Sequence, residues 1–196
     1  AARIGSTVVF VGRVGADEVG RALVAELASE AIDTGHVLVD RETPSGLAII
    51  TVDDAGENSI VVSPGANGRV SVGDVDGASA VLMAATVTLL QLEIPLDAVA
   101  AAAEASAGIV ILNAAPAAPL PDRLLRSTDV LVVNRGELQA LTGSDDPMSA
   151  RVLPIPVTVV TLGADGACIV RAESDGVIPA PAVTPVDTTG AGDTFC

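Results

Sequence analysis

The sequence predicts an α/β fold with a mainly parallel central sheet, helices on both faces of the sheet and one small β-hairpin. Strand and helix patterns alternate along the 196 residues, and several strands are unbroken runs of valine, isoleucine and leucine. Such runs are typical of parallel strands that helices cover on both sides. Two strand-like segments within residues 45–63 flank turn residues, which predicts the hairpin. We expect one α/β domain over residues 1–196, incomplete at both ends.

The first half of the chain supplies a strand, a helix and the hairpin. Residues 6–15 (STVVFVGRVG) predict a buried strand that ends in a glycine-rich turn. Apolar residues then recur at helical spacing, at Val19, Leu23, Leu27 and Ala31. The hairpin is predicted from strands Gly46–Val52 and Ser59–Ser63, joined by a turn at residues 54–56.

The second half repeats the alternation. We expect further elements at the following places: a strand in 86–94, an alanine-rich helix at Leu96–Ala107, a strand in 108–117, a short helix around Arg123, a strand and helix in 129–143, and strands in 157–170. Ligands of open parallel sheets collect at the carboxyl ends of the strands. The polar residues that follow strands are therefore the first candidates for a site: Glu93, Asn113, Asn134, Gly163 and the loop 187–193.

Composition excludes several classes of protein. The formal net charge of −15 argues against nonspecific binding to nucleic acid or to an anionic membrane. All ten basic residues are arginine, so these residues contain no P-loop lysine and no Schiff-base lysine. No apolar run reaches the roughly 20 residues of a membrane-spanning helix. The two cysteines, Cys168 and Cys196, predict no disulfide framework, and we expect a reducing cytoplasm.

The string DTTGAGDTFC at residues 187–196 has the chemistry of an anion site. Gly190 and Gly192 allow positive φ and leave backbone N–H groups uncovered. If a helix starts at Asp193 or Thr194, those groups point along its positive end and suit a phosphate. A carboxylate beside that position has an obvious task, which is to take a proton from a hydroxyl that attacks the phosphate. The alternative is an ordinary capped helix after a glycine turn. A dinucleotide fingerprint is disfavoured because Phe195 stands where GxGxxG needs its third glycine.

The full string DTTGAGDTF resembles the C-terminal signature of the PfkB carbohydrate kinases, the ribokinase family. Other segments resemble successive blocks of that family in the same order, and the resemblance covers essentially all of the chain: AARIGSTVVFVGRVGADEVG, SGLAIITVDDAGENSIVVSPGAN, LLQLEIP, ILNAAPA, NRGELQALTG and VTLGADGA. Within the family, QLEIP and GAN are most similar to the ribokinase branch. Ala114 stands where those relatives often carry proline, and residues 144–156 are shorter than the helix that many of them have there.

The resemblance implies roles for the terminal loop. Asp193 is similar to the catalytic base, which also contacts the sugar and the nucleotide. Gly190, Ala191 and Gly192 are similar to the anion hole over the transferred γ-phosphoryl group. Asp187 and Thr189 are similar to the residues that bind an activating monovalent cation, usually K⁺.

Three other positions gain roles in the same way, and each keeps an alternative. Asn134 and Glu137 are similar to a pair that handles the ATP phosphates and, through water, Mg²⁺; the alternative is a helix cap. A nucleotide-binding loop is implied at residues 161–166, where the alternative is a plain hairpin turn: Thr161, Leu162, Gly163, Ala164, Asp165 and Gly166. Glu93 is similar to a sugar-contacting carboxylate; the alternative is an exposed residue at a helix entry.

The resemblance implies ATP-dependent phosphorylation of a sugar hydroxyl, D-ribose to D-ribose 5-phosphate. Residues 45–63 would form part of a lid over the sugar, which in such kinases also pairs two subunits into a homodimer. Alternative acceptors are fructose, 2-keto-3-deoxygluconate and a nucleoside, and a catalytically inactive ligand-binding relative is a further alternative. Because the family's first strand and N-terminal substrate motif are not among these residues, we expect residues 1–196 alone to be inactive.

Overall fold

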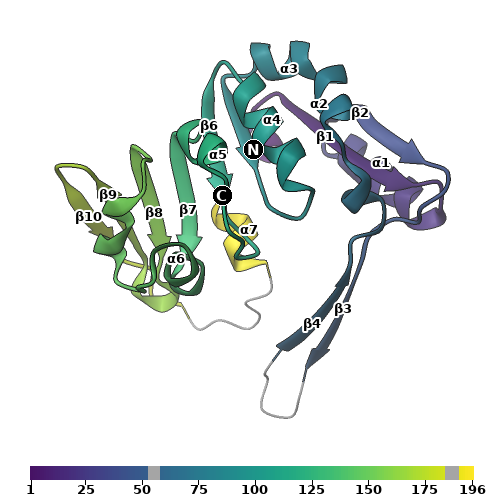
Figure 1. Ribbon diagram of the computed structural model, residues 1–196. Helices are drawn as coiled ribbons and strands as arrows, with labels where there is room; N and C mark the ends of the chain where they lie inside the picture. The colour runs from purple at the N-terminus through teal and green to yellow at the C-terminus, as the bar shows by residue number, and fades with distance from the viewer. Residues whose placement is uncertain (53–57, 184–189) are drawn as a thin grey trace. The chain divides into compact units, whose positions relative to one another are not determined.

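The computed structural model describes residues 1–52, 58–183 and 190–196 (Figure 1). The chain forms two compact units. The first contains residues 1–81 and 93–98, and the second contains residues 82–92 and 99–196. The turn predicted at residues 54–56 lies outside the described residues.

The first unit is built on a parallel strand pair. Strand β1 (Val8–Gly15) pairs with β2 (Ile32–Asp40), and helix α1 (Glu18–Ser29) connects them. Asp17 caps α1 by accepting a hydrogen bond from the amide of Gly20. The prediction placed Ala31 on this helix, and that is wrong, because the helix ends at Ser29 and Ala31 has a φ of 58°. Strand β2 was not among the predicted elements, since its sequence alternates only weakly.

The predicted hairpin is confirmed. Strands β3 (Leu47–Val52) and β4 (Asn58–Ser63) pair antiparallel, with Leu47 opposite Ser63. Short helices follow the hairpin: η2 (Gly65–Arg69), α2 (Val72–Gly77) and α3 (Ser79–Ala84). A further short helix precedes β1, η1 at Ala2–Ile4.

The second unit contains a six-stranded sheet in the order β10-β9-β8-β7-β6-β5. Its strands have these bounds: β5 (Val87–Leu90), β6 (Ile109–Asn113), β7 (Val130–Asn134), β8 (Val157–Thr161), β9 (Ala167–Arg171) and β10 (Asp175–Ile178). The four strands β5 to β8 run parallel, whereas β9 and β10 are antiparallel to their neighbours. The mainly parallel sheet is thus confirmed. The expectation that the 45–63 hairpin is the one departure from parallel pairing is wrong, because β9 and β10 are a second departure.

The remaining helices lie between these strands in the sequence, except α7, which follows β10. Their bounds are α4 (Leu96–Ala105), α5 (Asp122–Arg126), α6 (Arg135–Thr142), η3 (Pro147–Val152), η4 (Gly163–Asp165) and α7 (Ala191–Phe195). Helix α4 ends two residues before the predicted end at Ala107. Most of the large, fully buried side chains of the second unit are aliphatic, namely Leu112, Leu124, Leu131, Leu138, Val99, Val133 and Val160, and Thr158 is buried with them. A core of this kind is expected from a sequence without tryptophan or tyrosine.

Candidate functional site

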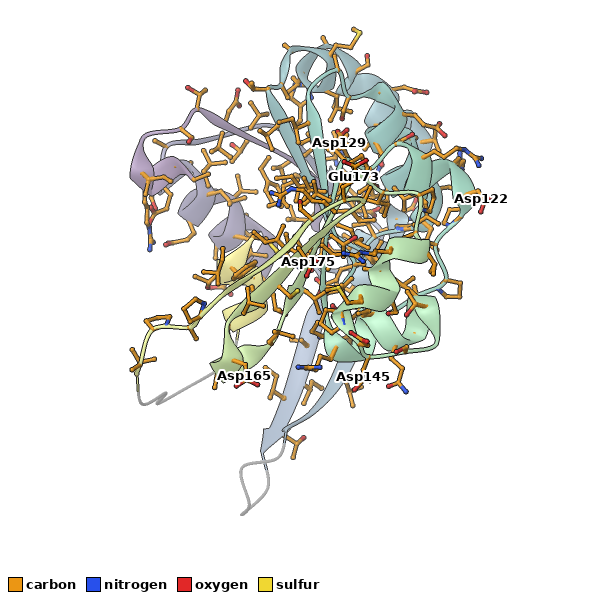
Figure 2. The ribbon with its side chains drawn as sticks, turned by 90° about the vertical axis from the view of Figure 1, so that its left-hand side faces the viewer. Asp122, Asp129, Asp145, Asp165, Glu173 and Asp175 are labelled. Carbon is orange, nitrogen blue, oxygen red and sulfur yellow. The ribbon has the colours of Figure 1, made fainter. Side chains whose placement is uncertain are left out.

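Four polar residues come to one edge of the six-stranded sheet. Because β5 to β8 are parallel, their carboxyl ends share an edge. The polar residues at or just after these strand ends are Gln91, Asn113, Asn134 and Thr161. Asp165, in the loop after β8, lies toward the same edge, and Asp129, which precedes β7, lies at the other end of the sheet (Figure 2). The carboxyl edge of parallel strands is where such sheets bind ligands.

Helix α7 lies at this edge, beside the end of β7 (Figure 1). The amide of Gln91 donates a hydrogen bond from Nε2 to Oδ1 of Asp193 over 3.2 Å, which ties α7 to the residue after β5. Sequence reasoning missed Gln91. Its position directly after a buried strand is the signal that could have found it.

Gly190 and Gly192 occupy different positions at the start of α7. Gly190 caps α7 with a φ of 69°, as its predicted freedom of positive φ allows. The predicted helix start at Asp193 or Thr194 is wrong, because α7 begins at Ala191 and Gly192 lies inside its first turn. The amide of Thr194 donates to the carbonyl of Gly190 over 2.9 Å, which closes the first helical turn. The amides before Thr194 have no partner within the helix.

Asn134 and Glu137 form a capping box at the start of α6. Asn134 Oδ1 accepts a hydrogen bond from the backbone N–H of Glu137, and Glu137 Oε2 accepts one from the backbone N–H of Asn134, each over 2.8 Å. The cap, which was the alternative interpretation of this pair, is therefore present. Burial raises the pKa of Glu137, and the hydrogen bond from Asn134 partly offsets this effect. A nearby cation stabilises the charged form of a partly buried carboxyl group such as this one.

Helices α6 and α7 both lie at the carboxyl edge of the sheet (Figure 1). Cys196 directly follows α7 and is exposed. Partial burial of its thiol raises its pKa, and the negative charges of Asp193 and Glu137 raise it further. Asp193 on α7 and Glu137 on α6 thus belong to two helices at the same edge of the sheet.

The loop between β8 and β9 is a hairpin turn, which was the alternative interpretation of residues 161–166. Thr161 pairs with Ala167 across the two strands, and the amide of Leu162 donates to the carbonyl of Gly166 over 2.8 Å. Gly163 and Gly166 have φ values of 60° and 94°. Gly163, Ala164 and Asp165 are exposed at the tip. A hairpin with an exposed tip at this edge remains compatible with a nucleotide-binding loop, and that role stays a prediction.

The roles of three further predicted residues stay predictions. Glu93 is exposed and belongs to the first unit, so its role as a sugar contact stays a prediction. Asp187 and Thr189 lie outside the described residues. Across residues 1–52, 58–183 and 190–196, no group of three or more histidine, cysteine, aspartate or glutamate side chains is arranged to hold a metal ion.

The base of the β3–β4 hairpin is held by Asp17. Its Oδ2 accepts from the Ser45 amide, and its Oδ1 accepts from the Ser45 hydroxyl and from the Gly20 amide, each over 2.7 Å. These hydrogen bonds, led by the one from the Ser45 amide, lower the pKa of Asp17. Gly15 completes the contact by donating to the Ser45 hydroxyl over 3.0 Å. The segment that enters the hairpin is thus fastened to the N-terminus of α1.

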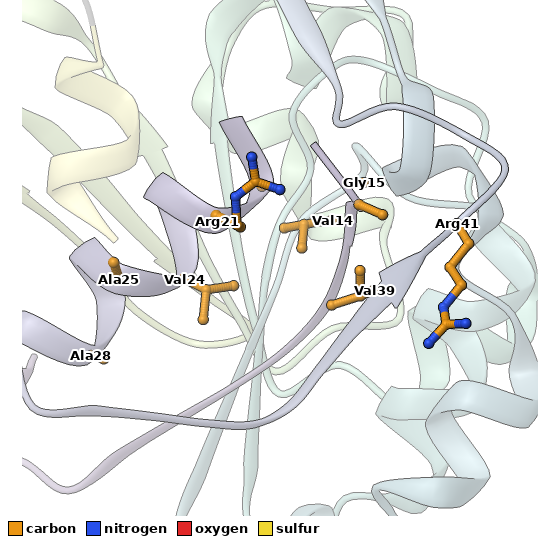
Figure 3. A pocket seen from close by; sticks show the side chains of 10 residues that line it. Val14, Gly15, Arg21, Val24, Ala25, Ala28, Val39 and Arg41 are labelled. Atoms are coloured by element: carbon orange, nitrogen blue, oxygen red, sulfur yellow. The ribbon is translucent and has the colours of Figure 1, made fainter. Parts of the chain in front are cut away.

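The first unit also contains a cavity of about 530 Å³ between α1 and the β1–β2 pair (Figure 3). Its walls are mainly apolar, and the residues that line it are Val14, Gly15, Ala16, Gly20, Arg21, Val24, Ala25, Ala28, Val39 and Arg41. None of them is a predicted site residue. The residues on which the predicted chemistry depends therefore do not line this cavity.

In the part of the chain that the structure describes, no helix is both long and apolar enough to cross a membrane. The whole sequence, residues 1–196, matches the model of the pfkB family carbohydrate kinases. It is 36% identical to a ribokinase of Haemophilus influenzae, with 100% of this chain and 68% of that protein covered. It is 35% identical to a deoxyribokinase of Salmonella typhi, again with 100% of this chain and 68% of that protein covered. An Arabidopsis thaliana ribokinase structure with ribose and ATP is similar at a TM-score of 0.85 and 30% identity, covering 99% of this chain and 68% of that one.

Proposed function

Because the chain belongs to the pfkB family of carbohydrate kinases, we propose that its protein transfers the γ-phosphoryl group of ATP to the primary hydroxyl of D-ribose. The products are D-ribose 5-phosphate and ADP. Similarity to a ribokinase at 36% identity supports ribose as the acceptor, and the Arabidopsis structure with ribose and ATP supports this pair of substrates. The observation that carries the proposal is the position of Asp193, in the first turn of α7 and hydrogen-bonded to Gln91 at the carboxyl edge of the sheet.

Asp193 is the general base of this proposal. Its carboxylate accepts the proton of the sugar hydroxyl while the hydroxyl oxygen forms a bond to the γ-phosphorus. The bond between the γ-phosphorus and the β,γ-bridging oxygen breaks, and the electron pair leaves with ADP. The Gly190–Gly192 amides stabilise the negative charge that develops on the phosphoryl oxygens. A Cβ built at Gly192 would meet no described atom within 4 Å, so packing in the described chain does not explain this glycine, whereas close approach of a phosphate does.

Nucleotide and cations are assigned to the neighbouring elements. The loop of residues 161–166 binds the nucleotide. Asn134 and Glu137 hold Mg²⁺ through its waters, and the half-buried carboxylate of Glu137, with its raised pKa, suits a cation. Mg²⁺, when bound, offsets the charge of the phosphates. Asp187 and Thr189 bind a monovalent cation, K⁺, on the strength of the sequence resemblance.

The β3–β4 hairpin is the lid of this proposal and pairs two copies of the chain into a homodimer. Apolar side chains are exposed on both of its faces. Leu47, Ile49 and Val61 lie on one face, and Ile50 and Val62 lie on the other, because successive residues of a strand point to opposite sides. One apolar face can close over a sugar, and the other can bury itself against a second lid. Val62→Asp should convert a dimer into a monomer in sedimentation experiments, and an unchanged mass would remove the lid from the interface.

D-ribose has several alternatives as the phosphoryl acceptor. Similarity to a deoxyribokinase at 35% identity makes deoxyribose a direct competitor. Fructose, 2-keto-3-deoxygluconate and a nucleoside remain alternatives within the family. A catalytically inactive relative is a further alternative, and the intact Gly190, Gly192 and Asp193 argue against it.

The test is ADP release by the complete gene product with Mg²⁺ and ATP, with and without K⁺, across ribose, deoxyribose, fructose, 2-keto-3-deoxygluconate and adenosine. We expect turnover that depends on ribose and on K⁺ and is lost in Asp193→Asn. Faster turnover with another acceptor would keep the mechanism and change the substrate. A folded protein that binds ATP and turns over none of the five would overturn the proposal.

A further inference from the structure

We infer that Gln91 is a positioning residue that holds the carboxylate of Asp193 for proton transfer, an inference that rests on the proposed function. Gln91 Nε2 donates to Asp193 Oδ1 over 3.2 Å. The two residues are far apart in the sequence, and both belong to the second unit.

Gln91 reaches Asp193 from a firmly held backbone. It follows β5 directly, and the amide of the next residue, Leu92, donates to the carbonyl of Ala115 over 3.0 Å. Leu92 is buried, with 8% of its surface exposed, so the chain on either side of Gln91 is fixed. The side chain of Gln91 itself is half-buried. A donor that starts from a fixed backbone can restrict the orientation of the carboxylate that it contacts.

An amide is suited to this task for a chemical reason. A carboxylate only accepts hydrogen bonds, so the amide presents its NH₂ group to Oδ1 and leaves Oδ2 for the substrate proton. Hydrogen bonding to the charged form of an acid favours that form, which is the form in which a base must start. An arginine would add a positive charge and weaken the base, and a glutamate at position 91 would repel it.

The other groups at this edge of the sheet make this donor more important. Glu137 is on α6, and Cys196 directly follows α7. Neither supplies positive charge. Gln91 is the described side chain that donates a hydrogen bond to Asp193.

A different role for Gln91 makes a different prediction. The amide could simply occupy the place on Asp193 that the sugar hydroxyl takes. Removal of the amide would then lower the KM for the sugar and leave kcat unchanged, whereas removal of a positioning residue lowers kcat at a similar KM.

The experiment compares Gln91→Met and Gln91→Glu in the complete gene product. Methionine has a similar length and no donor, and glutamate has the same shape with a negative charge. We expect Gln91→Met to lower kcat roughly 10- to 100-fold, with a sugar KM within about threefold of the wild type. Gln91→Glu should lower kcat at least as much, because glutamate offers no amide donor and its negative charge repels the carboxylate of Asp193.

Thermal melting and Mg²⁺–ATP binding serve as controls for folding. A folded Gln91→Met protein with wild-type kcat would overturn the inference, and so would a lower KM at unchanged kcat. If Gln91→Met does not fold, a wild-type kcat in Gln91→Glu has the same meaning. If the wild-type protein turns over no acceptor, the proposed function and this inference both fail. If the wild type is active and Gln91→Met keeps its kcat, only this inference fails.

Discussion

Asn134 and Glu137 exchange two hydrogen bonds at the start of α6, each over 2.8 Å. The pair can serve as a helix cap, as a cation site, or as both, and the two roles use different properties of Glu137. The cap needs an acceptor oxygen at the end of the side chain, and the cation needs its negative charge. Glutamine keeps the oxygen and removes the charge, so a single substitution can separate the roles.

Glu137→Gln should leave the fold intact and weaken the kinase. Because the cap survives, we expect the free energy of unfolding to change by no more than about 0.5 kcal/mol. We expect the Mg²⁺ concentration for half-maximal activity to rise roughly tenfold, since one carboxylate is lost from the site. The control is Asn134→Ala, which removes the cap acceptor and should cost about 1 kcal/mol of stability. Wild-type Mg²⁺ dependence in Glu137→Gln would limit this residue to capping.

The stability of the protein should depend on pH through the same carboxyl group. Burial raises the pKa of Glu137 above its ordinary value of 4.5, so the folded protein binds this proton more tightly than the unfolded chain does. The resulting stabilisation is fully present below the unfolded pKa and is lost as the pH rises through the folded pKa. Urea unfolding between about pH 4 and 7 should show wild-type stability falling relative to Glu137→Gln as the pH rises. Glu173→Gln, at an exposed position, is the matched control and should show no such trend. If the free energy of unfolding of the wild type and of Glu137→Gln changed with pH in the same way, the expected pH dependence would be contradicted.

The sequence predicted the elements whose hydrophobic pattern is strong and missed those that depend on distant contacts. Strands β5 to β8 are apolar runs, and they form the parallel sheet as expected. Strand β2 has a polar first half, and its pairing with β1 is what makes it a strand. Propensity along the chain cannot show such a partner.

The same contrast holds within the candidate site. Short sequence motifs predicted Asn134, Glu137 and Asp193. In the structure all three lie on elements at one edge of the sheet. The contact between Gln91 and Asp193 joins residues far apart in the sequence, so no local spacing could reveal it. The start of α7 was misplaced because a glycine at position 192 was taken as a loop residue, whereas the helix accommodates it in its first turn.

Loss of the Asp17 carboxylate should loosen the base of the β3–β4 hairpin. Asp17→Asn keeps one acceptor oxygen and replaces the other, so it cannot accept all three of the hydrogen bonds from Ser45 and Gly20. We expect faster hydrogen exchange at the Ser45 amide. The pKa of Asp17 is lowered, so its stabilising contribution is present above the ordinary value of 3.8 and is lost as the pH falls through the folded pKa. Asp33→Asn, whose carboxylate caps only a local turn at Gly35, is the control. Unchanged exchange at Ser45 in Asp17→Asn would show that the contact does not hold the hairpin base.

Two glycines of the β8–β9 turn should respond very differently to alanine. Gly163 has a φ of 60°, where a Cβ costs roughly 1 to 2 kcal/mol, whereas Gly166 has a φ of 94° and a ψ of −131°, outside the left-handed helical region that other residues can adopt. A Cβ at Gly163 meets no described atom within 4 Å, whereas one at Gly166 would overlap the carbonyl oxygen of Ile178. Gly166→Ala should therefore cost about 3 kcal/mol or more and shift the end of β10. Chemical denaturation of the two variants checks this difference, and equal losses would mean that the turn relaxes freely.

Alkylation of Cys196 should report whether α7 lies beside α6. Burial of the thiol, followed by the charges of Asp193 and Glu137, raises the pKa of Cys196, so less of the reactive thiolate is present near neutral pH. Removal of either charge should lower that pKa and speed the reaction with iodoacetamide about two- to threefold. Glu137→Gln is the more informative variant, because Asp193 is on the helix that the cysteine directly follows and Glu137 is on another. Cys168→Ser in the background removes the second thiol, and Asp175→Asn, whose charge acts on Cys168, is the matched control. A rate that rises in Asp193→Asn but not in Glu137→Gln would separate α7 from α6 and would leave Glu137 outside the site of proton transfer.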